Sequence, residues 1–162
     1  MRRAILRVRS GGQTGVDRAA LDAAVSIGWP YEGWCPRGGW AEDLTIPPGL
    51  LVKYPRLLET PSDLLEQRTE WNVRDSCATV VLIPGSIGNS QGTAFTIECT
   101  KRYEKPCFII DFRSDDADAQ ILAILSRFKE ERSLNVAGPR ESEAPGAYDA
   151  CRRRLVRAFS NA

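Results

Sequence analysis

Short apolar segments alternate with amphipathic segments along most of the chain. The apolar segments are a few residues long and rich in β-branched residues, as at 78–83 (AlaThrValValLeuIle). Between them, apolar residues recur at helical spacing, as at Val16, Ala19, Ala20, Ala23, Ala24 and Ile27. Apolar strands that alternate with amphipathic helices are typical of a parallel sheet covered by helices. The pattern therefore predicts a three-layer α/β/α Rossmann-like sandwich with a mostly parallel sheet of five or more strands.

The same pattern predicts where the individual elements lie. We expect strands at residues 4–8, 31–34, 56–59, 78–83, 107–112 and 134–137. We expect helices at residues 16–27, 61–73, 92–103, 117–131 and 147–159. Thr14 and Asp17 are spaced as a capping box for the first helix, and Thr60 followed by Pro61 predicts the start of the second. The Trp-, Gly- and Pro-rich stretch from 31 to 49 is otherwise irregular.

Length and composition indicate one globular domain that spans residues 1–162. A chain of 162 residues, 43% hydrophobic and 27% charged, suits one sizeable core. The first eight residues are too short and too charged for a signal peptide, and no run approaches the roughly 18 apolar residues that span a bilayer. We therefore expect a cytoplasmic protein with no membrane partner.

Charge, histidine and cysteine content exclude several kinds of chemistry. Lys and Arg total 22 against 21 acidic residues, which argues against a nucleic-acid partner. The chain has no histidine, which excludes Ser-His-Asp and Cys-His catalysis and histidine metal sites. Its five cysteines form no CxxC pair, which argues against a disulfide framework and a zinc site. We expect inert thiols and no protein-ligated metal.

Two junctions between a strand, a glycine-containing turn and a helix are candidate anion sites. The first contains Gly11, Gly12, Gln13, Thr14 and Gly15, and the second contains Ser90, Gln91, Gly92 and Thr93. Glycines allow a ligand to approach the backbone closely, and a helix start offers unpaired N–H groups with partial positive charge. Neither junction is a GxGxxG fingerprint or a GxxxxGK[ST] loop, so NAD binding and ATP hydrolysis are poorly supported.

Three further segments carry groups that could contact a ligand, and the first of them, residues 33–38, suits a planar, anionic one. Trp34 and Arg37 lie in one glycine-bounded loop, which is alternatively a packed Trp beside a surface Arg. Arg68, Glu70 and Asp75 lie in the C-terminal half of a predicted helix and could contact a ligand. The alternative interpretation is that they form an exposed lattice of ion pairs. Arg140 follows the last strand and suits a phosphate, or alternatively pairs with Glu141 or Glu143.

These segments together resemble the molybdenum-carrier (molybdenum cofactor carrier-like) family. The resemblance rests on SerGlyGlyGlnThrGlyValAspArgAlaAlaLeuAsp at 10–22, GlyTrpCysProArgGly at 33–38, AlaGluAsp at 41–43, ArgThrGluTrpAsnValArgAspSer at 68–76, GlyThrAlaPheThr at 92–96 and AsnValAlaGlyProArgGluSer at 135–142. It covers nearly the whole chain in order. It implies a protein that binds molybdenum cofactor as cargo for storage or delivery to a molybdoenzyme. It also implies a homo-oligomer, either a dimer or a tetramer.

The family belongs to a wider Rossmann-like group that includes Lys-decarboxylase-like phosphoribohydrolases. Those enzymes use ProGlyGlyxGlyThrxxGlu, whereas here Pro84-Gly85 lies well before Gly92-Thr93 and Glu98 comes five residues after Thr93. Because the wider group includes these enzymes, one alternative function is cleavage of the N-glycosidic bond of a nucleoside monophosphate, with Glu98, Asp17 or Glu70 as the carboxylate. Another is a non-catalytic nucleotide sensor.

The resulting hypothesis places a ligand phosphate in the glycine-rich loops without assigning a catalytic residue. The backbone of the first junction and the helix start at Gly92 and Thr93 would bind the phosphate, with charge supplied by arginines. The predicted binding residues are Gly11, Gly12, Gln13, Thr14, Gly15, Trp34, Arg37, Arg68, Glu70, Asp75, Gly92, Thr93 and Arg140.

Overall fold

Five parallel strands form the central sheet of the computed structural model, which describes residues 6–128 and 132–162. From one edge to the other the strands are β2 (Tyr31–Glu32), β1 (Arg7–Arg9), β7 (Ser133–Ala137), β5 (Ala78–Ile83) and β6 (Cys107–Asp111). This arrangement confirms the predicted parallel sheet. Because β1, β7 and β5 are adjacent and parallel, the loops that follow them leave the sheet at the same, carboxyl end.

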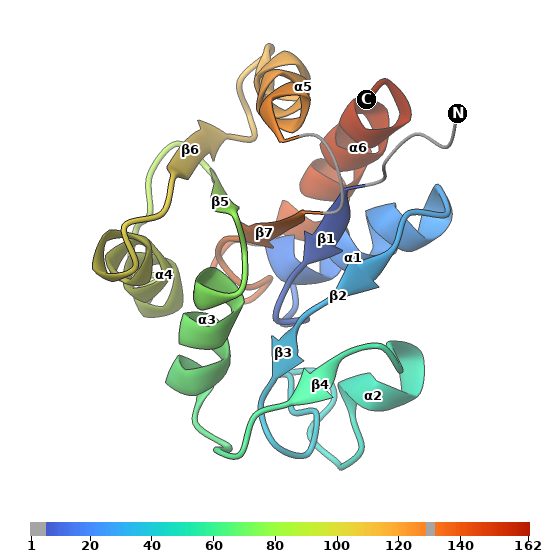
Figure 1. The fold of residues 1–162 in the computed structure, drawn as a ribbon, viewed down its shortest axis with the longest axis vertical. Helices are drawn as coiled ribbons and strands as arrows, with labels where there is room; N and C mark the ends of the chain where they lie inside the picture. Colours follow the sequence, from blue (N-terminus) through green and yellow to red (C-terminus); the bar gives the residue numbers. More distant parts are fainter. Residues whose placement is uncertain (1–5, 129–131) are drawn as a thin grey trace.

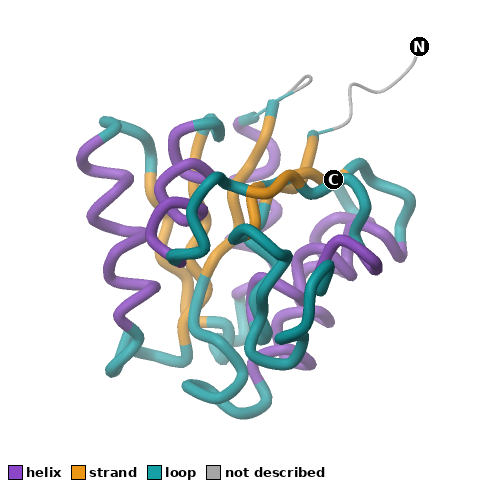
Figure 2. Tube along the Cα trace, turned by 90° about the horizontal axis from the view of Figure 1, so that it is seen from below, coloured by secondary structure: helices purple, strands orange, loops and turns teal. Residues whose placement is uncertain are grey.

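Helices cover both faces of the sheet. One face carries α1 (Val16–Ser26), α5 (Ala117–Arg127) and α6 (Ala147–Ser160), and the other carries α3 (Leu65–Arg74) and α4 (Gln91–Arg102) (Figure 1). Figure 2 shows the strands between two groups of helices. The predicted three-layer α/β/α sandwich is therefore confirmed.

The larger core lies between the sheet and the α1, α5 and α6 layer. The predicted apolar stripe of α6 is buried in it, at Ala147, Cys151, Leu155 and Phe159. The Phe159 ring stacks on Trp29, with 4.8 Å between the ring centroids. Small buried residues on α1, such as Ala19 and Ala23, let α1 pack closely beside α6.

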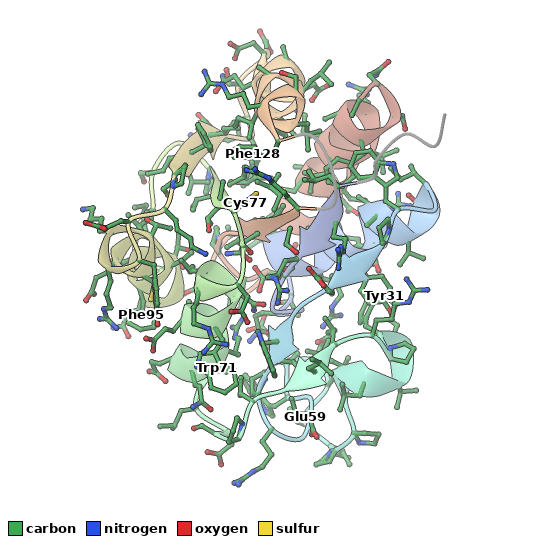
Figure 3. The ribbon with its side chains drawn as sticks, viewed as in Figure 1. Tyr31, Glu59, Trp71, Cys77, Phe95 and Phe128 are labelled. Atoms are coloured by element: carbon green, nitrogen blue, oxygen red, sulfur yellow. The ribbon has the colours of Figure 1, made fainter. Side chains whose placement is uncertain are left out.

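Residues 34–59 form a small lobe, whose buried residues pack together with Leu21 of α1 in a second, smaller core. Its two-stranded parallel sheet contains β3 (Trp34–Cys35) and β4 (Leu58–Glu59), and α2 (Leu50–Lys53) follows a long loop. Tyr31, labelled in Figure 3, packs edge-on against Tyr54, with 5.9 Å between ring centroids. The sequence did not predict α2, and the predicted strand at 31–34 is wrong because it contains two strands that belong to different sheets.

The break between those two strands falls at Gly33. A Cβ atom there would lie 2.0 Å from the carbonyl oxygen of Ser10, and the φ angle of 149° also favours glycine. The close approach of the two chain segments therefore requires glycine and turns the chain out of the main sheet.

Several predicted boundaries are also wrong. The capping box is absent, because Gly15 caps α1 and the Thr14 hydroxyl donates to Glu42 instead. Helix α3 begins at Leu65 rather than at Pro61, because the Thr60 hydroxyl donates to the carbonyl oxygens of Cys35 and Ser62. Strand β1 is Arg7–Arg9 and α5 ends at Arg127. The predictions for residues 4–5 and 129–131 lie outside the described residues.

The cysteines are free thiols, and three of them (Cys35, Cys99 and Cys151) are buried. Burial raises the pKa of Cys35 and that of Cys99 to about 11. These two thiols are therefore protonated, and hence poor nucleophiles, near neutral pH. In the part of the chain that the structure describes, no helix is long and apolar enough to cross a membrane.

Candidate functional site

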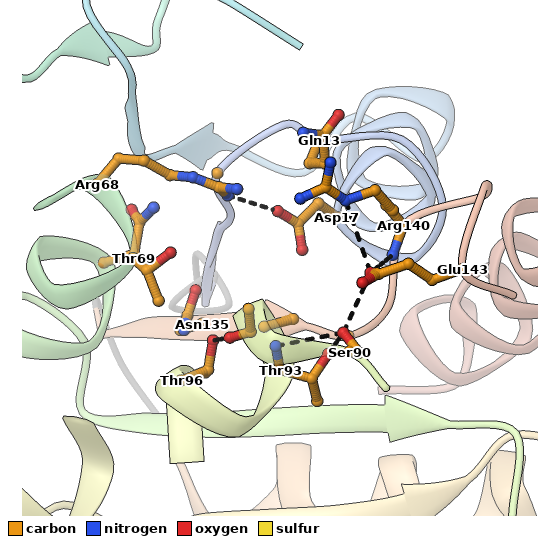
Figure 4. Close-up of a pocket in the computed structure, with 15 residues that line it drawn as sticks. Gln13, Asp17, Arg68, Thr69, Ser90, Thr93, Thr96, Asn135, Arg140 and Glu143 are labelled. Carbon is orange, nitrogen blue, oxygen red and sulfur yellow. Dashed lines mark hydrogen bonds and ion pairs between the residues drawn. The ribbon is translucent and has the colours of Figure 1, made fainter. Parts of the chain in front are cut away.

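A narrow cleft lies at the carboxyl ends of β1 and β7, between α1, α3 and the start of α4 (Figure 4). Its free space is about 40 Å³ because two arginine side chains, those of Arg68 and Arg140, extend into it. This is room for only a few water molecules. The lining residues are Gly11, Gln13, Asp17, Arg68, Thr69, Asn72, Ser90, Gly92, Thr93, Thr96, Asn135, Ala137, Gly138, Arg140 and Glu143.

The first glycine-rich junction contributes two of its five predicted residues, Gly11 and Gln13, to the cleft. The carbonyl oxygen of Gly12 faces away and accepts a 3.0 Å hydrogen bond from Nε of Arg18. Gly15 packs against the loop after β7, where an added Cβ would lie 2.5 Å from the carbonyl oxygen of Pro139 at a φ of 77°. Most of this junction therefore shapes the loop rather than the cleft wall.

The second junction presents the start of α4 to the cleft. Gly92 and Thr93 line it, together with Ser90 and Thr96. Ser90 is the N-cap residue, and its hydroxyl oxygen accepts a long, 3.4 Å hydrogen bond from the Thr93 amide. The unpaired amides and the helix dipole at this end favour an anion.

We expect Ser90→Ala to lower the free energy of unfolding by about 1 kcal/mol, because the Thr93 amide loses its cap. Urea unfolding followed by circular dichroism measures this loss. Ser126→Ala is the control, since the Ser126 hydroxyl is exposed and donates only to the carbonyl of Ala123. Equal stability of the two variants would show that the long cap bond contributes nothing.

A buried ion pair closes one side of the cleft. Nη1 of Arg68 lies 3.0 Å from Oδ2 of Asp17, and the two side chains are only 11% and 8% exposed. The guanidinium lies directly over Gly11, where a Cβ would come within 2.0 Å of Nη1. Burial raises the pKa of Asp17, although the neighbouring Arg68 opposes that change. Nε of Arg68 is buried and has no hydrogen-bond partner.

The other side of the cleft is closed by Arg140 and Glu143. Nε of Arg140 lies 3.6 Å from Oε1 of Glu143, and Nη1 lies 3.8 Å from Oε2 of Glu42. The same Glu143 oxygen accepts the backbone N–H of Arg140 and the Ser90 hydroxyl, each at 3.1 Å. Arg140 therefore sits between two carboxylates at the mouth of the cleft.

Residues 41–43 (AlaGluAsp) form hydrogen bonds that connect the loops around the cleft. Glu42 accepts hydrogen bonds from the hydroxyls of Thr14 and Ser142, the latter at 2.6 Å, and so ties the first junction to the loop after β7. Burial raises the pKa of Glu42, but these hydrogen bonds outweigh burial, so that the pKa is lowered overall. Asp43 accepts two 2.8 Å hydrogen bonds from Arg18, whose Nε holds the Gly12 carbonyl.

The pairing of Asp43 with Arg18 predicts a pH-dependent contribution to stability. The Arg18 guanidinium lowers the pKa of Asp43 below its ordinary value of 3.8. This contribution is therefore present above the unfolded-state pKa and is lost as the pH falls through the folded-state pKa. We expect Asp43→Asn to be less stable than the wild type at pH 7, with a difference that shrinks below about pH 4. Urea unfolding across this range checks this, and a constant difference would contradict it.

Besides Gly12, Thr14 and Gly15 of the first junction, four further predicted binding residues lie outside the cleft: Trp34, Arg37, Glu70 and Asp75. The indole N–H of Trp34 donates to Asp75 at 2.7 Å, and the Trp34 ring packs edge-on against Trp71 on α3, labelled in Figure 3. Glu70 accepts the Tyr103 hydroxyl at 2.7 Å. Arg37 is exposed, pairs with Asp63 at 3.7 Å and lines a separate open hollow beside Trp40 and Pro47. These contacts fit the alternative interpretations, in which Trp34 packs within the protein and the charged residues form pairs at the surface.

Several cleft residues escaped prediction. Thr69 and Asn72 lie on α3 within the segment that carries Arg68, and Asn135 is a buried polar residue near the end of β7. Asn135 lies between the apolar Leu134 and Val136, and a polar residue at such a position is a signal of a ligand or of a buried hydrogen bond; its amide donates to the Thr79 hydroxyl at 3.3 Å. Within the described ranges, no group of three His, Cys, Asp or Glu side chains is arranged to hold a metal ion.

Comparisons with known proteins agree with this architecture. Residues 8–159 match the circularly permutated YpsA SLOG family. A crystal structure of a protein named "putative molybdenum carrier protein", from Syntrophus aciditrophicus, is 36% identical, with a TM-score of 0.80 over 97% of this chain and 96% of that one. No curated protein matches. The neighbour confirms the resemblance noted in the sequence, and the chain belongs to the circularly permutated YpsA SLOG family.

Proposed function

We propose that this protein is a carrier that holds a phosphorylated small molecule, with molybdenum cofactor as its cargo. The observation that carries the proposal is the convergence of both glycine-containing junctions and two arginines on one cleft. The start of α4 supplies backbone donors, and Arg140 supplies a charge that can form paired hydrogen bonds with a phosphate. Gly11 leaves the backbone accessible once the Arg68 guanidinium above it moves.

The carrier role is supported by the structural neighbour, which is named "putative molybdenum carrier protein". In this role the cargo brings its own molybdenum, so the protein needs to bind the phosphate and to cover the pterin. Movement of Arg68 and Arg140 on binding would enlarge the cleft and place both guanidinium groups beside the ligand. The carrier role requires no residue of the protein to perform a chemical step.

A second candidate function, cleavage of the N-glycosidic bond of a nucleoside monophosphate, is favoured by one observation. Of the three carboxylates considered for it, only Asp17 lines the cleft, and burial raises its pKa. Glu98 is exposed and pairs with Arg102, and Glu70 pairs with Tyr103. Asp17 could act as a general acid or base only after Arg68 leaves it. Release of free base that is abolished in Asp17→Asn would establish this function.

Thermal-shift measurements against molybdenum cofactor, molybdate, tungstate and nucleoside monophosphates test the proposal, with mass spectrometry of every sample that shifts. A specific ligand at a hundredfold excess over its dissociation constant stabilises the protein by about 2.7 kcal/mol. We expect selective stabilisation by molybdenum cofactor. Stabilisation by nucleotides alone would contradict the carrier role. Free base in those samples would then indicate an enzyme that cleaves nucleoside monophosphates, and intact nucleotide would indicate a non-catalytic nucleotide sensor.

A further inference from the structure

One carboxylate already occupies the place that the proposed function gives to a phosphate. Oε1 of Glu143 lies 3.1 Å from the Ser90 hydroxyl, 3.1 Å from the backbone nitrogen of Arg140 and 3.6 Å from Nε of Arg140 (Figure 4). A carboxylate oxygen that accepts two hydrogen bonds and lies beside a guanidinium at a helix start has the surroundings of a bound anion.

This carboxylate reaches the start of α4 from a distant part of the chain. Glu143 lies 53 residues after Ser90, on the loop between β7 and α6, so it is not a local cap of α4. A local cap is already present in the Ser90 hydroxyl, which accepts from the Thr93 amide. The Glu143 side chain is 29% exposed, so it has a route by which to turn outward into solvent.

The cleft also has donors that Glu143 does not use. Nε2 of Gln13 is buried and without a partner, in a residue that lines the cleft and is only 5% exposed. Nε of Arg68, on the opposite wall, is likewise buried and unpartnered. Buried donors without partners are costly, and in a cleft they are available to hydrogen-bond a ligand that enters it. A phosphoryl group brings three terminal oxygens where a carboxylate brings two, so it can satisfy more of these donors.

We propose that Glu143 is a built-in competitor for the phosphoryl group, and that cargo binds by displacing its carboxylate from Ser90 and Arg140. The inference rests on the proposed function, because it assumes that a phosphoryl group binds at this end of α4. Since two anions cannot share these donors without strong repulsion, Glu143 must turn away as the ligand enters. Glu143 therefore lowers the affinity for weakly held anions and restricts the cleft to ligands that make contacts beyond the phosphate.

Titration calorimetry with inorganic phosphate and pyrophosphate tests this inference on the wild type, Glu143→Gln and Glu143→Ala. We expect both variants to bind pyrophosphate about tenfold more tightly than the wild type, because the competing charge is gone. Glu66→Gln is the matched control, since Glu66 is exposed on the first turn of α3 and loses the same charge. Urea midpoints show that each variant is folded.

The two variants separate competition from a positioning role. If Glu143 only positions Arg140, Glu143→Ala weakens binding and Glu143→Gln restores it in part, which overturns the inference. Suppose that the wild type, Glu143→Gln and Glu143→Ala bind pyrophosphate with equal affinity, while Arg140→Ala does not bind it. That result overturns the inference but leaves the proposed function standing. Failure of every form, including the wild type, to bind either probe overturns the phosphate site and the inference together.

Discussion

Arg140→Ala is expected to lower the affinity for a phosphorylated ligand by about a hundredfold, because hydrogen bonds to a charged partner are worth roughly 1.5–3 kcal/mol. Arg140 extends into the cleft beside the start of α4, with Glu42 and Glu143 as its present partners. Those contacts are long, 3.8 and 3.6 Å, so the guanidinium can exchange them for a phosphate. Titration calorimetry with the ligand that the thermal-shift panel identifies measures the loss.

Arg153→Ala is the matched control for this prediction. Arg153 is exposed on α6 and lines a different hollow, beside Phe112 and Arg113, so its removal deletes the same charge away from the cleft. We expect it to leave affinity unchanged. Similar losses in both variants would mean that overall charge, rather than the cleft, attracts the ligand.

Asp17→Ala is expected to lower the free energy of unfolding by about 3–5 kcal/mol, because it leaves the buried charge of Arg68 without its partner. The two side chains are 8% and 11% exposed, and they join α1 to α3 at one side of the cleft. Urea unfolding followed by tryptophan fluorescence measures the loss. Asp63→Ala is the control, because its pair with Arg37 is exposed on both sides and should contribute less than about 1 kcal/mol.

A double variant identifies the cause of the destabilisation. Replacing Arg68 with Met in the Asp17→Ala protein removes the unpaired charge and keeps most of the side-chain volume, so part of the lost stability should return. A double variant that is less stable than Asp17→Ala alone would show that Arg68 stabilises the fold through contacts other than the ion pair.

The strands and helices could be predicted from the sequence wherever the pattern of apolar residues in a segment is compatible with only one type of secondary structure. The apolar run at 78–83 is β5, buried along its whole length, because a central parallel strand is covered on both faces. The four-residue spacing of Ala147, Cys151, Leu155 and Phe159 fits only a helix with one buried face, and α6 has that face.

The failures come from contacts between distant residues. Thr14 and Asp17 have the spacing of a capping box, but Glu42 takes the Thr14 hydroxyl and Arg68 takes the Asp17 carboxylate. Likewise, the Thr60 hydroxyl donates to the Cys35 carbonyl in the small lobe rather than capping a helix. Local spacing carries no information about partners more than twenty residues away.

The cleft was predictable in its framework but not in its closing side chains. The strand ends at Gly11 and the helix start at Gly92 converge because parallel strands send their loops to one edge of the sheet. Trp34 was predicted to contact the ligand but packs against Trp71 on α3. A Trp between glycines has the same local sequence in both situations, so the sequence does not distinguish them. The position of Glu143 depends on the course of the loop after β7, which no local pattern determines.

The most direct test of the carrier proposal is mass spectrometry of the intact protein under non-denaturing conditions, after anoxic mixing with molybdenum cofactor, for the wild type and Arg140→Ala. The account predicts one cofactor bound per chain in the wild type and loss of that species in Arg140→Ala, with Arg153→Ala unchanged. Absence of the cofactor from the wild type, or equal occupancy in Arg140→Ala, would contradict the claim that this cleft carries it.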